Sequence, residues 1–172
     1  MTTTADILQA LSGAEAELDD AAAHASGGRE HANQVHQQAS TRGWEGVAGS
    51  MALVIGGFDA CLAGFGTALV SVGDARGPVS EIVSGMNPAE VRSRLTTAVA
   101  AIERAEEAIA GVYPELDRAE SVVKQALDGG QAGPLLRFIT LANQATARAR
   151  QHASAANTTT TGQIPQASAL GN

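Results

Sequence analysis

A heptad pattern of apolar residues across residues 88–128 constrains the fold of this chain more than any other feature. Apolar side chains recur there at alternating steps of four and three residues, which places them on one face of an α-helix. The positions of this seam are Val91, Leu95, Ala98, Ile102, Ala105, Ile109, Val112, Leu116, Ala119, Val123 and Ala126. The phase carries across Pro114, so we expect one long helix that is kinked at that proline.

Two upstream segments repeat the pattern. A helix is expected to begin near Thr4, because apolar residues recur at heptad steps from Ile7 to Ala25. Its continuation to about residue 40 stays open, since residues 27–46 are compatible with one helix, two helices or a loop. A second helix is expected over residues 47–75, where the apolar face is wider, and this helix is predicted to be the most buried one. Six glycines interrupt residues 47–75, which indicates close packing against a neighbouring helix.

Turn and cap residues mark the expected helix ends. Gly77-Pro78 is predicted to break the chain after the second helix. Asn87-Pro88-Ala89-Glu90 predicts the next helix start, with asparagine as the N-cap and proline at the first helical position. Gly129-Gly130 predicts the end of that helix, and Gly133-Pro134 predicts the start of a last one.

Together these elements predict an all-α protein, either an antiparallel helical bundle or a coiled-coil hairpin. Residues 1–152 are expected to form the helical bundle domain, and residues 153–172 a disordered low-complexity tail. Aromatic residues make up only 3% of the chain, so alanine supplies much of the apolar surface and the helices must approach closely. We expect the helix of residues 88–128 to pack antiparallel to that of residues 47–75.

The net charge of −7 argues against nucleic-acid binding, which requires a basic face. The charge is distributed unevenly along the chain. Residues 1–128 contain eight basic and all 18 acidic residues, whereas the remainder has three arginines and no acidic residue. Two interpretations stay open: the last helix folds onto an acidic bundle, or the bias belongs to a solvated tail.

Residues that could carry chemistry are few. No two of the four histidines lie three or four residues apart, the spacing that a metal site on one helix needs; they are His24, His31, His36 and His152. The single cysteine, Cys61, lies in an apolar stretch and is predicted to be a buried structural thiol. No glycine-rich loop follows the phosphate-binding pattern. We therefore expect no catalytic, metal-binding or cofactor-binding residues, and no enzymatic activity.

Residues 51–73 are long enough to cross a membrane, which takes about 20 apolar residues. The spacing of Gly56, Ala60 and Gly64 suits helix packing inside a membrane. Asp59 opposes insertion, because a charge near the bilayer centre costs about 3 kcal/mol. The heptad phase also matches that of the other helices, which favours a buried bundle helix over a membrane helix.

Trp44-Glu45-Gly46 lies between the first two expected helices, at the position of a turn. This arrangement over residues 5–75 resembles the WXG100 family of small helical hairpins from type VII secretion systems of actinobacteria. The resemblance implies that Trp44 and Gly46 lie at the turn and that hairpins pair into four-helix bundles. Tyr113 and Asp117 resemble the Tyr-x-x-x-Asp/Glu export signal of such substrates, although Pro114 departs from that pattern and the motif lies some forty residues after the hairpin.

The leading hypothesis is therefore a non-enzymatic helical interaction protein, a WXG100-like type VII secretion substrate or partner that acts by helix–helix pairing. Its recognition residues would be Trp44, Gly46, Tyr113 and Asp117, and its partner a protein, either further copies of the chain or another helical chain. The first residues lack the pattern of a signal peptide, so we expect secretion without one, or a cytoplasmic location. Two alternatives stay open: a membrane-inserted or membrane-active helical protein using residues 51–73, and a cytoplasmic coiled-coil structural protein.

Overall fold

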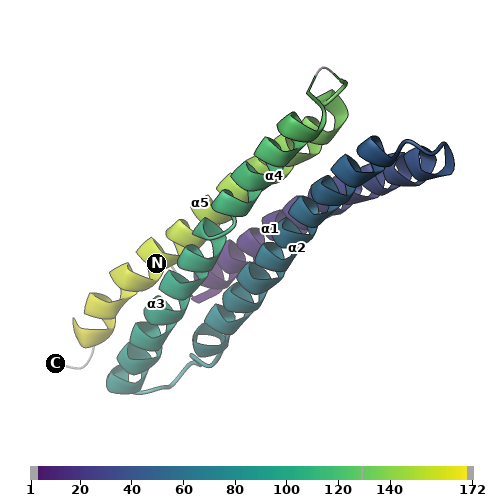
Figure 1. Ribbon diagram of the computed structural model, residues 1–172. Helices are drawn as coiled ribbons and strands as arrows, with labels where there is room; N and C mark the ends of the chain where they lie inside the picture. The colour runs from purple at the N-terminus through teal and green to yellow at the C-terminus, as the bar shows by residue number, and fades with distance from the viewer. Residues whose placement is uncertain (1–3, 129, 170–172) are drawn as a thin grey trace.

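The computed structural model describes residues 4–128 and 130–169, which are almost entirely helical and contain no β-strand. The helices are α1 (Thr4–Thr41), α2 (Glu45–Ser80), α3 (Pro88–Ala110), α4 (Tyr113–Ala126) and α5 (Gly133–Ala169). Because α3 and α4 follow one another along the same direction, the chain forms four long rods (Figure 1). The predicted all-α helical bundle is confirmed.

The four rods pack antiparallel in a closed ring. α1 contacts α2 and α5, and the rod of α3 and α4 contacts the same two helices from the other side. Arg29 on α1 pairs with Asp59 on α2 at 2.6 Å, and Arg148 on α5 pairs with Glu17 on α1 at 2.7 Å. An arginine of the acid-free C-terminal part therefore lies against the acidic first helix, in agreement with the first interpretation of the charge asymmetry.

The core consists of the heptad seams, and close helix contact compensates for its small side chains. Seam residues of all five helices are buried, and Phe58 and Phe65 are the largest side chains among them. The ring of Phe58 on α2 packs directly against Gly28 of α1. Gly27, its neighbour, lies against Phe138 of α5 in the same way. Glycines on α1 thus make room for the few aromatic rings of the core.

The rod of α3 and α4 is interrupted one turn before Pro114, where a single kinked helix was expected. A proline ring clashes with the carbonyl of the residue four positions earlier, which here is Ala110. α3 ends at that residue, and Gly111 and Val112 link it to α4 in right-handed backbone conformations. Val112 and Leu116 are both buried, so the heptad phase survives the interruption.

The structure also differs from the sequence prediction after residue 152. α5 continues to Ala169, so the expected disordered tail is helical over residues 153–169, while residues 170–172 lie outside the described part. Ala153, Ala156 and Thr160 extend the buried seam of α5. Asn157 donates a hydrogen bond to Glu106 of α3 at 2.7 Å, which joins this segment to the bundle. Small residues that resemble a linker in sequence here fill a tight helix interface.

The hairpin of α1 and α2 extends beyond the other two rods. Gly57 of α2 lies against Ala119, and α4 ends seven residues after Ala119, opposite Ser50. The turn that joins α1 to α2 therefore projects past the end of α4 by about 10 Å at 1.5 Å per residue. Figure 1 shows the tip of this hairpin and the α4–α5 connection as two separate ends of the bundle.

Candidate functional site

The turn between α1 and α2 is built by a glycine with a left-handed backbone. Gly43 has a φ of +71°, a conformation that side chains other than glycine rarely adopt. Its N–H donates to the carbonyl of Ser40, and the N–H of Trp44 donates to the carbonyl of Ala39 at 2.8 Å. These two bonds form a Schellman motif, which ends α1 and turns the chain back on itself.

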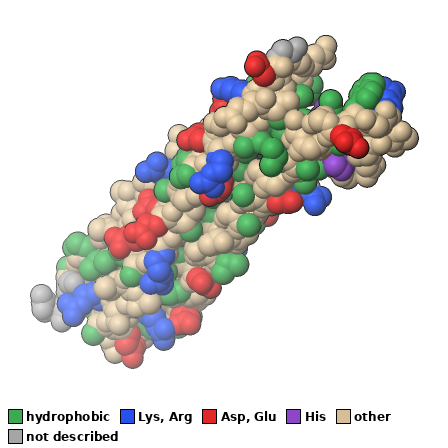
Figure 2. Space-filling view, in the orientation of Figure 1, with side chains coloured by type: hydrophobic (Ala, Val, Ile, Leu, Met, Phe, Trp, Pro, Cys, Tyr) green, Lys and Arg blue, Asp and Glu red, His purple; other side chains and the backbone are tan. Residues whose placement is uncertain are grey.

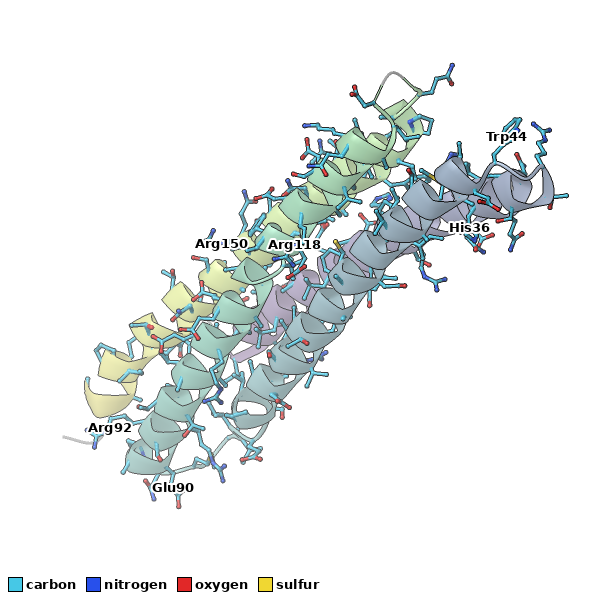
Figure 3. The ribbon with its side chains drawn as sticks, in the orientation of Figure 1. His36, Trp44, Glu90, Arg92, Arg118 and Arg150 are labelled. Carbon is cyan, nitrogen blue, oxygen red and sulfur yellow. The ribbon has the colours of Figure 1, made fainter. Side chains whose placement is uncertain are left out.

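Trp44 lies at the tip of this hairpin, where its indole points outward (Figure 3). The side chain is 52% exposed, which is unusual for the only tryptophan of a protein so poor in aromatic residues. The guanidinium of Arg42 lies 5.0 Å from the ring centroid, within the range of a cation–π interaction. The ring therefore rests against a cation rather than in the core, and about half of the side chain stays exposed to solvent.

Gly46, the other residue of the Trp-x-Gly sequence, lies in the first turn of α2 and is exposed. A Cβ added to this glycine would meet nothing within 4 Å. Packing within the bundle therefore does not require glycine at this position.

Tyr113 and Asp117 lie one helical turn apart at the start of α4. Tyr113 is half-buried and Asp117 is exposed. The adjacent Val112 faces Gly64 of α2, so Tyr113 is level with the middle of α2, some 20 residues along it from Trp44. That spacing corresponds to about 30 Å. The structure therefore does not bring the four predicted recognition residues into one patch, but into two separate pairs.

The outward face of α2 is apolar and exposed, a feature that the sequence analysis missed. Leu53 is 68% exposed and Val70 is 65% exposed. We name as the outer seam the row of residues that connects them, Gly49, Leu53, Gly56, Ala60, Ala63, Thr67 and Val70. Figure 2 shows mainly hydrophobic and other uncharged atoms along the part of α2 that faces the viewer, with charged side chains at its margins. The prediction that α2 is the most buried helix holds for its inner face alone.

A shallow groove of about 580 Å³ runs beside the outer seam, between α2 and the junction of α3 and α4. Its lining consists mostly of small side chains: Ala60, Ala63, Gly64, Thr67, Ala108, Gly111, Glu115 and Arg118. Glu115 and Arg118 pair with each other at 2.6 Å on its α4 side, and Arg118 faces the viewer in Figure 3. The groove is thus uncharged along α2 and carries a neutralised ion pair on the opposite wall.

The glycines of α2 fall into two groups. Gly57 contacts the backbone of Ala119, and Gly64 contacts Val112, as expected for close helix packing. Of the six glycines between residues 47 and 75, the other four would each meet nothing within 4 Å of an added Cβ; they are Gly49, Gly56, Gly66 and Gly73. The close helix packing predicted from the six glycines is therefore found within the bundle at Gly57 and Gly64.

Cys61 is fully buried on the inner face of α2, as predicted for a structural thiol. Burial raises the pKa of the thiol from 9.0 to about 11, and the negative charge of Glu115 adds to this rise. The thiol is therefore protonated at neutral pH. A protonated, enclosed thiol is a poor nucleophile, so this residue serves packing rather than chemistry.

The raised pKa of Cys61 predicts a loss of stability in alkali. The unfolded thiol ionises near pH 9 and the folded one near pH 11, so the unfolded chain releases its proton first. The contribution of the Cys61 thiol to the free energy of unfolding is fully present well below pH 9. It should fall by about 2 kcal/mol between pH 8 and 10.5. Urea unfolding of the wild type and Cys61→Ala at both pH values isolates this term. Equal pH slopes for the two proteins would contradict it.

The histidines have separate surroundings. His36 Nδ1 lies 2.9 Å from the carbonyl of Ala48 and links α1 to α2 near the hairpin tip. His24 and His31 line a pocket of about 690 Å³ at the start of α5, beside Arg137 and Phe138. Within residues 4–128 and 130–169, no three His, Cys, Asp or Glu side chains come together as a metal site would require.

Comparison with protein-family models gives a match over residues 86–172, which is 87 of the 172 residues. The match spans α3, α4 and α5, and includes Tyr113 and Asp117 but not the α1–α2 hairpin. Searches of curated proteins and of solved structures find no significant match. The chain belongs to DUF6244, a family of unknown function.

Proposed function

We propose that the protein is a non-enzymatic helical interaction protein, a WXG100-like substrate or partner of a type VII secretion system that acts by helix pairing. The observation that carries the proposal is the exposed Trp44 at the projecting turn of the α1–α2 hairpin. Tryptophan is enriched among residues that dominate protein interfaces, because its large ring loses much hydrated surface on binding. An exposed tryptophan at a hairpin tip is therefore suited to insertion into a partner.

The arrangement of the two halves of the chain supports the same proposal. The α1–α2 hairpin has the Trp-x-Gly sequence at its turn, which is the place that the WXG100 resemblance implies. Its apolar inner face is covered by α3, α4 and α5 of the same chain. In this proposal the C-terminal half takes the position of a second hairpin. One chain would then build the four-helix bundle that WXG100 proteins build from two hairpins.

The two pairs of recognition residues would then act at different places. Trp44 and Gly46 present the hairpin tip, and Tyr113 with Asp117 presents a second patch about 30 Å away. Such a separation suits a partner that reads an elongated helical surface rather than a compact pocket.

Fractionation of the native host tests the proposal. Trp44→Ala combined with Tyr113→Ala should lower the amount in the culture supernatant by at least about tenfold, the equivalent of 1.4 kcal/mol in recognition. Val83→Ala, an exposed apolar residue in the connection between α2 and α3, is the matched control and should be exported normally. Because Tyr113 is half-buried, Asp117→Asn provides a second variant on an exposed residue.

Unchanged export of the double variant and of Asp117→Asn would overturn the secretion proposal. A wild-type protein found only in the cytosol would instead favour a coiled-coil structural protein. Circular dichroism of each variant shows whether the bundle is intact, so that loss of export is not confused with loss of the fold.

One observation favours a second candidate, a membrane-active helix. α2 is long and apolar enough to cross a membrane, and only 28% of its most apolar window is buried in the bundle. Insertion would require α2 to leave the bundle, which exposes the seams of the other helices to water. Flotation with phosphatidylcholine and phosphatidylglycerol vesicles tests this candidate. Protein that stays at the bottom of the gradient would contradict it.

A further inference from the structure

A cavity between α1 and α5 lies apart from the residues that the proposed function uses. Its volume is about 690 Å³. Small-molecule sites commonly occupy about 300–1,000 Å³, so a ligand of one or two rings would fit. Two side chains of α1 and four of α5 form most of its wall: His24, His31, Pro134, Arg137, Phe138 and Leu141.

The apolar part of this wall is held in place by both helices. The ring of Phe138 reaches from α5 to α1 at Gly27, where an added Cβ would lie 2.8 Å from Cε1 of the ring. His31 lies beside the same ring, with 6.5 Å between the ring centroids and 43° between the ring planes. Aromatic rings attract one another at such distances, so a further flat ring could pack against this pair.

Two hydrogen-bond donors of the wall are unoccupied. Arg137 is exposed, and within the described part of the chain its guanidinium makes no ion pair or hydrogen bond. Arg148, about three turns further along α5, instead pairs with Glu17 and Asp20 of α1. The half-buried ring of His31 also lacks a polar partner among the described residues. An imidazole ring has an N–H donor in both of its protonation states.

The cavity is basic in a chain that is acidic overall. None of the described residues that line it is aspartate or glutamate, although the chain has 18 acidic residues against 11 lysines and arginines. One carboxylate lies at its margin, where Asp20 is 3.5 Å from Nε2 of His24. Arg148 binds the same carboxylate at 3.3 Å. The positive charge of Arg137 therefore has no counter-ion within the described chain.

The chemistry of the wall is complementary to an aromatic carboxylate. A carboxylate matches the planar fork of a guanidinium and can accept two parallel hydrogen bonds from it. Its single charge would balance the one unpaired charge, that of Arg137. The aromatic part of such a ligand would lie against Phe138 and Leu141. A neutral ring would leave the guanidinium without an acceptor, and a cation would be repelled by it.

We propose that the cavity between α1 and α5 binds a small aromatic carboxylate. Arg137 and His31 bind the carboxylate group, and Phe138 and Leu141 pack against the ring. This role is independent of the proposed secretion function, because neither Trp44 nor Tyr113 lines the cavity. Since Arg137 is exposed, the carboxylate stays partly hydrated, and a two-ring ligand should bind with a dissociation constant of about 0.1–1 mM.

Titration with 2-naphthoate at constant pH, to about 5 mM, tests the site in the full chain. Nuclear magnetic resonance follows the ring C–H signals of the four histidines. The signals of His24 and His31 should shift and saturate. His36 bonds to a carbonyl of α2 and His152 lies farther along α5, so their signals should stay in place. The uncharged 2-naphthalenemethanol should bind at least about fivefold more weakly, because it cannot pair with a guanidinium.

Arg137→Gln should weaken the binding of 2-naphthoate at least about tenfold, because it removes the charge that the carboxylate pairs with. Arg150→Gln, on another exposed arginine of α5 (Figure 3), is the matched control and should bind as the wild type does. Circular dichroism checks that both variants keep the bundle. Signals that do not move, equal shifts at all four histidines, or full affinity in Arg137→Gln would each overturn the inference.

Discussion

Replacing Phe58 by alanine is expected to lower the free energy of unfolding by about 3–5 kcal/mol, the range for a fully buried aromatic side chain. Phe58 is 1% exposed, and its ring reaches from α2 across the bundle to Gly28 of α1. The chain has only three phenylalanines, so the core has few large side chains that could fill the space that Phe58 leaves. Most of the surrounding core side chains are alanine, valine or leucine, and short side chains relax poorly into a large cavity.

Urea unfolding followed by circular dichroism measures this loss. Leu53→Ala on the same helix is the matched control. Leu53 is 68% exposed, so its truncation should change the stability by less than about 0.5 kcal/mol. Similar losses at both positions would mean that α2 does not pack with the faces that the structure assigns to it.

Introducing a single methyl group at Gly28 is expected to destabilise the bundle by about 1–3 kcal/mol, the usual cost of overpacking a core. An added Cβ would lie 2.5 Å from Cε1 of Phe58 and 3.1 Å from Cβ of Phe138. Both phenylalanines belong to neighbouring helices, so α1 would have to move away from α2 and α5. Alanine gains about 1 kcal/mol in helix propensity over glycine, and the steric cost must exceed this gain for the expected sign to appear.

Gly66→Ala is the control for the propensity term, since an added Cβ there meets nothing within 4 Å. That variant should be more stable than the wild type by about 0.5–1 kcal/mol. The double variant Gly28→Ala with Phe58→Ala should lose at least about 0.5 kcal/mol less than the sum of the single losses, because the new methyl fits where the ring was. Additive losses, or a stabilised Gly28→Ala, would contradict the contact.

Much of the bundle could be predicted from local signals. The seam is buried from Leu95 to Val123 as expected and partly buried at its two ends, Val91 and Ala126. Asn87 accepts a hydrogen bond from the N–H of Glu90 as an N-cap. These features depend on residues three or four positions apart, which any helix brings together. The position of the first turn was also predicted, because Trp44-Glu45-Gly46 lies between two helical patterns, and the structure places the left-handed Gly43 just before it.

The candidate site could be predicted only in part. Trp44 was assigned to a turn and lies in one, but its exposure depends on how far α1 and α2 project beyond α4 and α5. The distance between Trp44 and Tyr113 likewise depends on the antiparallel register of α2 and α4. The outer seam was missed because the sequence does not tell whether an apolar residue such as Leu53 is buried against another helix or exposed to solvent.

The sequence by itself determined that this chain is helical, where most helices start and which row of each helix is most apolar, because these properties arise from interactions within a few residues. The tertiary structure alone decided that residues 153–169 pack as helix, that Pro114 separates α3 from α4, and that the outer seam of α2 stays open. Each of these depends on which surfaces of distant helices meet, since an alanine row is stable as a helix only where another helix covers it.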